Sequence, residues 1–424
     1  MAILSGCNPE KASAPEFIQP VKPAYGHATA LPEGEVLYDK VLGALVGSAI
    51  GDAMGASTEM WHRTDIRRTY GYINNLTPAV RNQSPEGTWD HNLGAGATTD
   101  DTRWKALMSY YLEPAEQAWS AASFASHIVD FYGQAVGGID TEKAALDPDL
   151  LEAPLEQVDW IREWARVALA YQQGPEPYHR ARDRFYGGEM SCAGMLYTPV
   201  FGLVSRDPLS AYELAFEHTL FDIGYARDIS ALLAAMTRTA VDTRNMDSIL
   251  NTAVFTDPLR YQDSRLVGRI SLQTAQRARD QVRRALQMEP NFQGPVLDSL
   301  LRNIPEGYPG SPSDWVRQEA IYTLLEKDQE AIPFHAGEIW QILIAGLEFG
   351  QGDFEKTMAF IVNYGRDNDT VAAVAGMILG ASLGYEELPE STRETVLKVN
   401  REQLGIDLEA AARRISGYSS QQAH

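Results

Sequence analysis

The sequence predicts an all-helical protein. Long segments place apolar residues at the three- and four-residue spacing of one helix face, whereas few stretches alternate as half-buried strands do. Segments rich in proline and glycine separate the helical ones and predict the connections at 174–188, 288–313 and 328–337. The expected helices span residues 38–56, 99–112, 115–133, 155–173, 208–241, 268–287, 313–327, 336–348, 354–363, 369–384 and 407–415.

No fixed-period repeat appears, so a solenoid is not favoured. At 424 residues the chain can bury a large core, and the length alone allows two or three domains or one elaborated domain. Residues 8–37 carry repeated prolines without helical periodicity. We therefore expect residues 1–37 to be a tether and residues 38–424 to form a single helical domain.

Composition excludes several classes of function. A hydrophobic content of 44% with 22% charged residues is typical of a globular protein. The net charge of −21 disfavours partners bound through phosphate backbones, so no nucleic-acid partner is expected. Cys7 and Cys192 are the two cysteines, and neither lies in a zinc-ligand spacing.

The N-terminus suggests a membrane tether rather than a membrane span. No apolar run reaches the roughly 18 residues that a crossing helix needs. The stretch Leu4-Ser5-Gly6-Cys7 follows a short apolar run and resembles the end of a bacterial lipoprotein signal. Lipidation of Cys7 would place the protein in the cell envelope, periplasmic or at the surface, which is slightly favoured over the cytoplasm.

The first predicted helix carries glycine at 43, 47, 51 and 55. Each interior helical glycine costs roughly 1 kcal/mol, so four of them indicate close packing against another backbone or a tightly built site. Asp52 lies within this helix and Glu59 just beyond it, and acids in such a place need a partner.

Two acid clusters begin later helices. Thr99-Asp100-Asp101-Thr102 lies near one end of the chain and Asp367-Asn368-Asp369-Thr370 near the other. Helix capping explains either cluster alone. If the two are adjacent, four carboxylates gather and their repulsion requires cations. Oxygen donors without His or Cys suit Mg²⁺ first, with Mn²⁺ or Ca²⁺ as alternatives, and two ions could share the set.

These motifs, together with Gly51-Asp52-Ala53-Met54-Gly55 and Glu59, resemble the ADP-ribosylglycohydrolase family in order and spacing over roughly residues 38–390. The resemblance implies a compact orthogonal multi-helix fold with two Mg²⁺ ions, related to the dinitrogenase reductase activating glycohydrolase. It implies hydrolysis of the bond between ribose C1 of an ADP-ribosyl group and a small molecule or protein. Glu59 and Asp101 would be catalytic. The implied metal ligands are Thr99, Asp100, Asp101, Asp367, Asp369 and Thr370.

The sequence departs from the family on the substrate side. Leu196 follows Met195 where many members carry arginine, and Arg366 stands where many have glycine. Asp52, Gly194 and Arg366 are the expected substrate-binding residues, although Arg366 could instead pair with a neighbouring acid. Insertions relative to a minimal family member lie near 141–189 and 243–335, where they would build walls of the cleft.

Two other functions stay open. The same fold and metal centre could act on another glycoside or nucleoside outside the cytoplasm, a hypothesis favoured by the altered loops and by the N-terminal stretch. A non-catalytic ligand-binding protein is the third alternative. The oligomeric state does not follow from the sequence.

Overall fold

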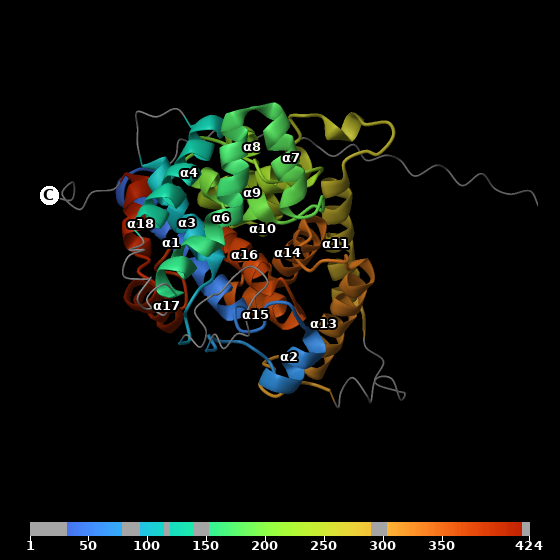
Figure 1. The fold of residues 1–424 in the computed structure, drawn as a ribbon. Helices are drawn as coiled ribbons and strands as arrows, with labels where there is room; N and C mark the ends of the chain where they lie inside the picture. The colour runs from blue at the N-terminus through green and yellow to red at the C-terminus, as the bar shows by residue number, and fades with distance from the viewer. Residues whose placement is uncertain (1–31, 79–93, 114–118, 139–151, 290–302, 418–424) are drawn as a thin grey trace, which may run out of the picture.

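The computed structural model describes residues 32–78, 94–113, 119–138, 152–289 and 303–417, and within them the predicted all-helical class is confirmed (Figure 1). The strands in this part of the chain are the two-residue β1 (Trp61–His62) and β2 (Gly365–Arg366). The helices are α1 (Gly34–Gly55), α2 (Arg63–Tyr70), α3 (Asp100–Leu112), α4 (Ala121–Gly137), α6 (Glu152–Gln173), α7 (Pro175–Phe185), α8 (Pro208–Glu217), α9 (Ala226–Asp242), α10 (Met246–Phe255), α11 (Ile270–Gln287), α13 (Pro312–Leu325), α14 (Ala336–Gly350), α15 (Phe354–Tyr364), α16 (Asn368–Leu383), α17 (Glu390–Gln403) and α18 (Leu408–Ser416).

Helices α1 and α16 form the centre of the core. Residues 41–55 of α1 and 368–382 of α16 are buried on every side, as expected for helices without a polar face. In Figure 1, α16 lies in the middle, with α17 and α18 on one side and α11 and α13 on the other. The ends of α1 and α16 are thereby fixed inside the protein.

Glycines bring these two backbones into direct contact. A Cβ built on Gly47 would lie 2.3 Å from the Gly376 carbonyl oxygen, and one on Gly43 would lie 2.6 Å from that of Gly380. A Cβ on Gly55 would lie 2.4 Å from Asp369 Cα. The glycine spacing in the sequence is thus explained by close packing, which also sets the end of α1 against the start of α16.

Several predicted helix boundaries and connections differ from the observed ones. The predicted helix 208–241 is two helices, α8 and α9, separated by a non-helical segment at residues 218–225. This segment brings the Asp222 carboxylate to the Gly194 backbone N–H. The predicted connection 174–188 contains α7, which starts after Gly174 (φ 118°) with a proline in its first turn. Helices α2, α10 and α17 were not predicted.

The predicted N-terminal boundary is also shifted. Helix α1 begins at Gly34, inside the segment 1–37 that was expected to be a tether. Cys7 lies outside the described residues, so lipidation and location in the cell envelope stay predictions. None of the helices in the described ranges combines the length and apolarity of a membrane crossing.

The regions predicted as insertions pack onto the helical body. In the first, α6 contacts α4 and α7; in the second, α10 contacts α9, and α11 contacts α13 and α14. The single-domain boundaries themselves stay a prediction.

The glycine contact between α1 and α16 predicts a specific stability change. Gly47→Ala should lower the free energy of unfolding by about 1–3 kcal/mol, because the added methyl overlaps backbone atoms that can move only together with α16. Gly133→Ala in α4, where a Cβ would meet nothing within 4 Å, is the control and should raise it by up to about 1 kcal/mol. Chemical denaturation measures both, and equal effects would contradict the close-packing account.

Candidate metal centre

A two-residue β-ladder places Glu59 beside Asp367. Trp61 pairs with Arg366 across the ladder, and the Met60 N–H donates to the Arg366 carbonyl at 2.7 Å. Met60 and Arg366 both have φ 64°, a left-handed conformation that costs of order 1–3 kcal/mol for such residues. The strain occurs at the residues that adjoin Glu59 and Asp367. Glycine would adopt the left-handed conformation at position 366 without this cost, whereas Arg366 adopts it with strain.

Glu59, Asp367 and Asp369 form the centre of the site. Each offers a carboxylate oxygen, and these three oxygens lie within 4.8 Å of one another. Asp367 and Asp369 are buried, whereas Glu59 is half-buried. Three hard oxygen donors at this separation fit a divalent cation of the Mg²⁺, Mn²⁺ or Ca²⁺ type. We call these three residues the carboxylate cluster.

Asp52 anchors the start of α3 to this cluster. Its fully buried carboxylate accepts hydrogen bonds from Thr99 N (2.9 Å), Thr102 N (3.0 Å) and Thr102 Oγ1 (2.6 Å). Burial, with the nearby charges of Asp101 and Asp369, raises the pKa of Asp52 well above its usual range. The Asp52 carboxylate thus holds the start of α3 in place, and its expected role in substrate binding stays a prediction.

The first residues of α3 approach the N-terminus of α16. Thr99 Oγ1 lies 3.4 Å from Asp369 Oδ2, and Thr370 Oγ1 donates to Asp101 Oδ2 at 3.0 Å. The two acid clusters of the sequence are therefore adjacent in space. Asp100 is half-buried at the first position of α3.

Asp101 forms a buried ion pair with Lys105. Its Oδ1 is 2.9 Å from Lys105 Nζ, and both side chains are 1% exposed. Among the described residues, neither Asp101 nor Asp100 belongs to the carboxylate cluster, and their expected roles as metal ligands stay predictions. Lys105 was missed in the sequence, although its position four residues after Asp101 on a helix is the spacing of an ion pair.

Arg366 pairs with a neighbouring acid. Its Nε and Nη2 donate to the two oxygens of Glu338 at 2.6 and 2.8 Å, and Glu338 is 3% exposed. Nη2 also donates to the Glu330 carbonyl oxygen at 2.8 Å. Of the two interpretations of Arg366, the geometry favours the salt bridge over contact with a substrate anion.

Gly194 is buried against Asp222. Its N–H donates to Asp222 Oδ1 at 2.7 Å, and a Cβ at this position would lie 2.1 Å from Asp222 Oδ2. Glycine is required there because the carboxylate approaches so closely, which is a structural reason distinct from the expected substrate contact. The adjacent loop also brings Cys192 Sγ to 3.6 Å from Asp367 Oδ2, a contact that no sequence pattern indicated.

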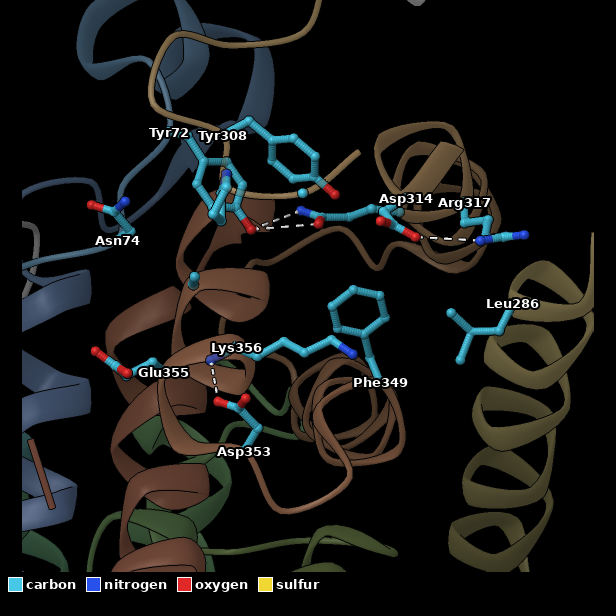
Figure 2. Close-up of a pocket in the computed structure, with 14 residues that line it drawn as sticks. Tyr72, Asn74, Leu286, Tyr308, Asp314, Arg317, Phe349, Asp353, Glu355 and Lys356 are labelled. Carbon is cyan, nitrogen blue, oxygen red and sulfur yellow. Dashed lines mark hydrogen bonds and ion pairs between the residues drawn. The ribbon is translucent and has the colours of Figure 1, made fainter. Parts of the chain in front are cut away.

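A separate hollow of about 530 Å³ lies between the C-terminal ends of α11 and α14 and the first turns of α13 and α15. Figure 2 shows the rings of Tyr72, Tyr308 and Phe349 around it, with Lys356 at its edge. None of the predicted site residues lines this hollow. The carboxylate cluster, rather than the hollow, is therefore the candidate functional site.

The fold and the carboxylate cluster together define the class of protein. It is an all-helical protein with a candidate centre for a divalent metal ion. The model of the ADP-ribosylglycohydrolase family matches residues 33–423, and the chain belongs to this family. The resemblance drawn from the motifs is thus confirmed. The expectation of a hydrolase of the glycosidase class is confirmed at the level of the family.

Two further comparisons agree. A solved chain described as an ADP-ribosylglycohydrolase-related protein complex has a TM-score of 0.54, with 18% identity, over 90% of this chain and 98% of that chain, which shows a shared fold. A segment of 43 residues is 40% identical to the uncharacterized protein YegU of Escherichia coli (strain K12). It spans 10% of this chain and 13% of that relative.

Asp222 predicts a pH-dependent component of stability. Burial raises its pKa to about 6, whereas an unfolded Asp titrates near ~3.9. The folded protein therefore holds this proton more tightly, so the stabilisation is complete below about pH 4 and is lost as the pH rises through about 6. Asp222→Asn keeps an acceptor for the Gly194 N–H but cannot ionise.

The variant should therefore gain stability relative to the wild type by about 3 kcal/mol between pH 4 and pH 7. Urea denaturation at several pH values measures the difference. Parallel stability curves for the two proteins would show that Asp222 does not titrate in this range.

Proposed function

We propose that the protein is a metal-dependent hydrolase that cleaves the glycosidic bond at ribose C1 of an ADP-ribosylated small molecule or protein, with Mg²⁺ as the first candidate ion. Family membership supports the reaction class, and the carboxylate cluster is the observation that carries the proposal. The donor set consists of carboxylate and hydroxyl oxygens, which is the preference of Mg²⁺, and of Mn²⁺ and Ca²⁺ after it.

Glu59, Asp367 and Asp369 would hold the ion, with the hydroxyls of Thr99 and Thr370 beside them. A bound divalent ion supplies charge stabilisation to substrate oxygens and lowers the pKa of bound water. Thr370 is held by Asp101, and Thr99 by the Asp52 contact to its N–H. The fully buried Asp52 and Asp101 thus serve as positioning residues.

Glu59 is the residue proposed to act on water. It is half-buried and is therefore the most exposed member of the cluster, whereas Asp367 and Asp369 are 3% and 2% exposed. A carboxylate in this place can accept the proton of an attacking water as the ribose C1 bond breaks and the leaving group departs. Cleavage at C1 develops positive charge on the sugar, which the surrounding carboxylates favour.

Glu59→Gln predicts a loss of activity in a protein that remains folded. With Mg²⁺ present, release of ADP-ribose from ADP-ribosyl-arginine, ADP-ribosylated protein or O-acetyl-ADP-ribose should fall at least about a hundredfold. Glu355→Gln is the matched control, because Glu355 is exposed in the first turn of α15 and lines the separate hollow rather than the cluster.

If the wild type releases nothing from all three substrates, the ADP-ribosyl proposal is wrong. A screen of other glycosides and nucleosides with the same two variants then tests the alternative substrate class. Tight ADP-ribose binding without turnover would instead indicate the non-catalytic ligand-binding protein.

A further inference from the structure

Lys105 is a buried cation at the metal centre. It lies in the second turn of α3, and its side chain and that of Asp101 are each 1% exposed. Within the described ranges, Asp101 is the carboxylate at ion-pair distance from its Nζ. A buried ammonium needs a counter-charge, since burial without one is strongly unfavourable.

Both carboxylate oxygens of Asp101 therefore accept a hydrogen bond from the chain. Oδ1 accepts from Lys105 at 2.9 Å and Oδ2 accepts from Thr370 Oγ1 at 3.0 Å. A divalent ion bound to Asp101 would share this carboxylate with the Lys105 ammonium, which is 2.9 Å from Oδ1. The two positive charges would then lie close together and repel each other.

The carboxylate cluster stands apart from this pair. Glu59, Asp367 and Asp369 bring their oxygens within 4.8 Å of one another, and Asp101 does not belong to that group. Glu59, Asp367 and Asp369 thus face one candidate cation site, whereas Asp101 is neutralised by Lys105.

We propose that the Lys105 ammonium takes the place of a second divalent cation, so that the centre binds one metal ion, held by Glu59, Asp367 and Asp369. This inference rests on the proposed function, because it concerns the same centre, and it replaces the two ions that the family resemblance implies. Asp101 keeps its role of positioning Thr370, with an amine instead of a metal ion as its cation.

Metal stoichiometry tests this inference without any enzymatic assay. Metal-stripped wild-type protein is titrated with Mg²⁺ by calorimetry and with Mn²⁺ by electron paramagnetic resonance. We expect one ion per chain and the resolved hyperfine pattern of an isolated Mn²⁺. Lys105→Met keeps the bulk of the side chain but removes the charge, so Asp101 should now recruit a second ion and the two Mn²⁺ spectra should broaden through spin coupling.

Lys398→Met is the matched control, because Lys398 is exposed in α17 and its loss should leave one ion bound. The double variant Lys105→Met/Asp101→Asn removes both charges together, which protects folding, and it should also bind one ion. If the wild type binds two ions, or if folded Lys105→Met still binds one, the inference is overturned.

The outcomes separate the inference from the proposed function. One bound ion with no hydrolysis of any ADP-ribosyl substrate would leave the inference standing and would refute the proposed function. Hydrolysis with two bound ions would do the reverse. A wild type that binds no ion would overturn both.

Discussion

The direct contact between the α1 and α16 backbones is the constraint on which the rest of the structure depends. Glycines at 43, 47, 376 and 380 let the two helices approach until a methyl group would overlap a carbonyl oxygen. Because helices are rigid, this contact also fixes their ends, so that Asp369 at the start of α16 lies against Gly55 at the end of α1. The short ladder between β1 and β2 then continues the contact and holds Glu59 beside Asp367.

Burial of a carboxylate is unfavourable unless hydrogen-bond donors or a positive charge stabilise it. Different groups of the chain stabilise the different buried acids. Asp52 is held by the N–H groups and hydroxyl of α3, Asp101 by Lys105, and Glu338 by Arg366. These three acids are each matched by donors from the chain. Glu59, Asp367 and Asp369 instead gather together, which is the arrangement a divalent cation would stabilise. Asp52 and Asp101 thus hold the start of α3 and Thr370 in place beside the carboxylate cluster.

Residue type alone did not reveal the contacts that Asp52, Gly194 and Arg366 make within the fold. Asp52, Gly194 and Arg366 were expected to contact substrate, yet each is engaged by another part of the fold. Asp222 approaches Gly194 only because the chain leaves helical geometry between α8 and α9. Helical periodicity could not predict that turn, since the apolar spacing continues through it. Glu338 likewise reaches Arg366 from a separate helix.

The sequence by itself determined the helical class, the family and the two acid clusters that meet in space, because apolar spacing and contiguous motifs are local properties of the chain. The glycine stripe of α1 was also evident, since its spacing of four residues needs no partner to be seen. Only the tertiary structure decided which acids converge on the candidate cation site and which form ion pairs within the chain. That division depends on distances of a few ångströms between α1, α3 and α16, and long-range packing sets those distances.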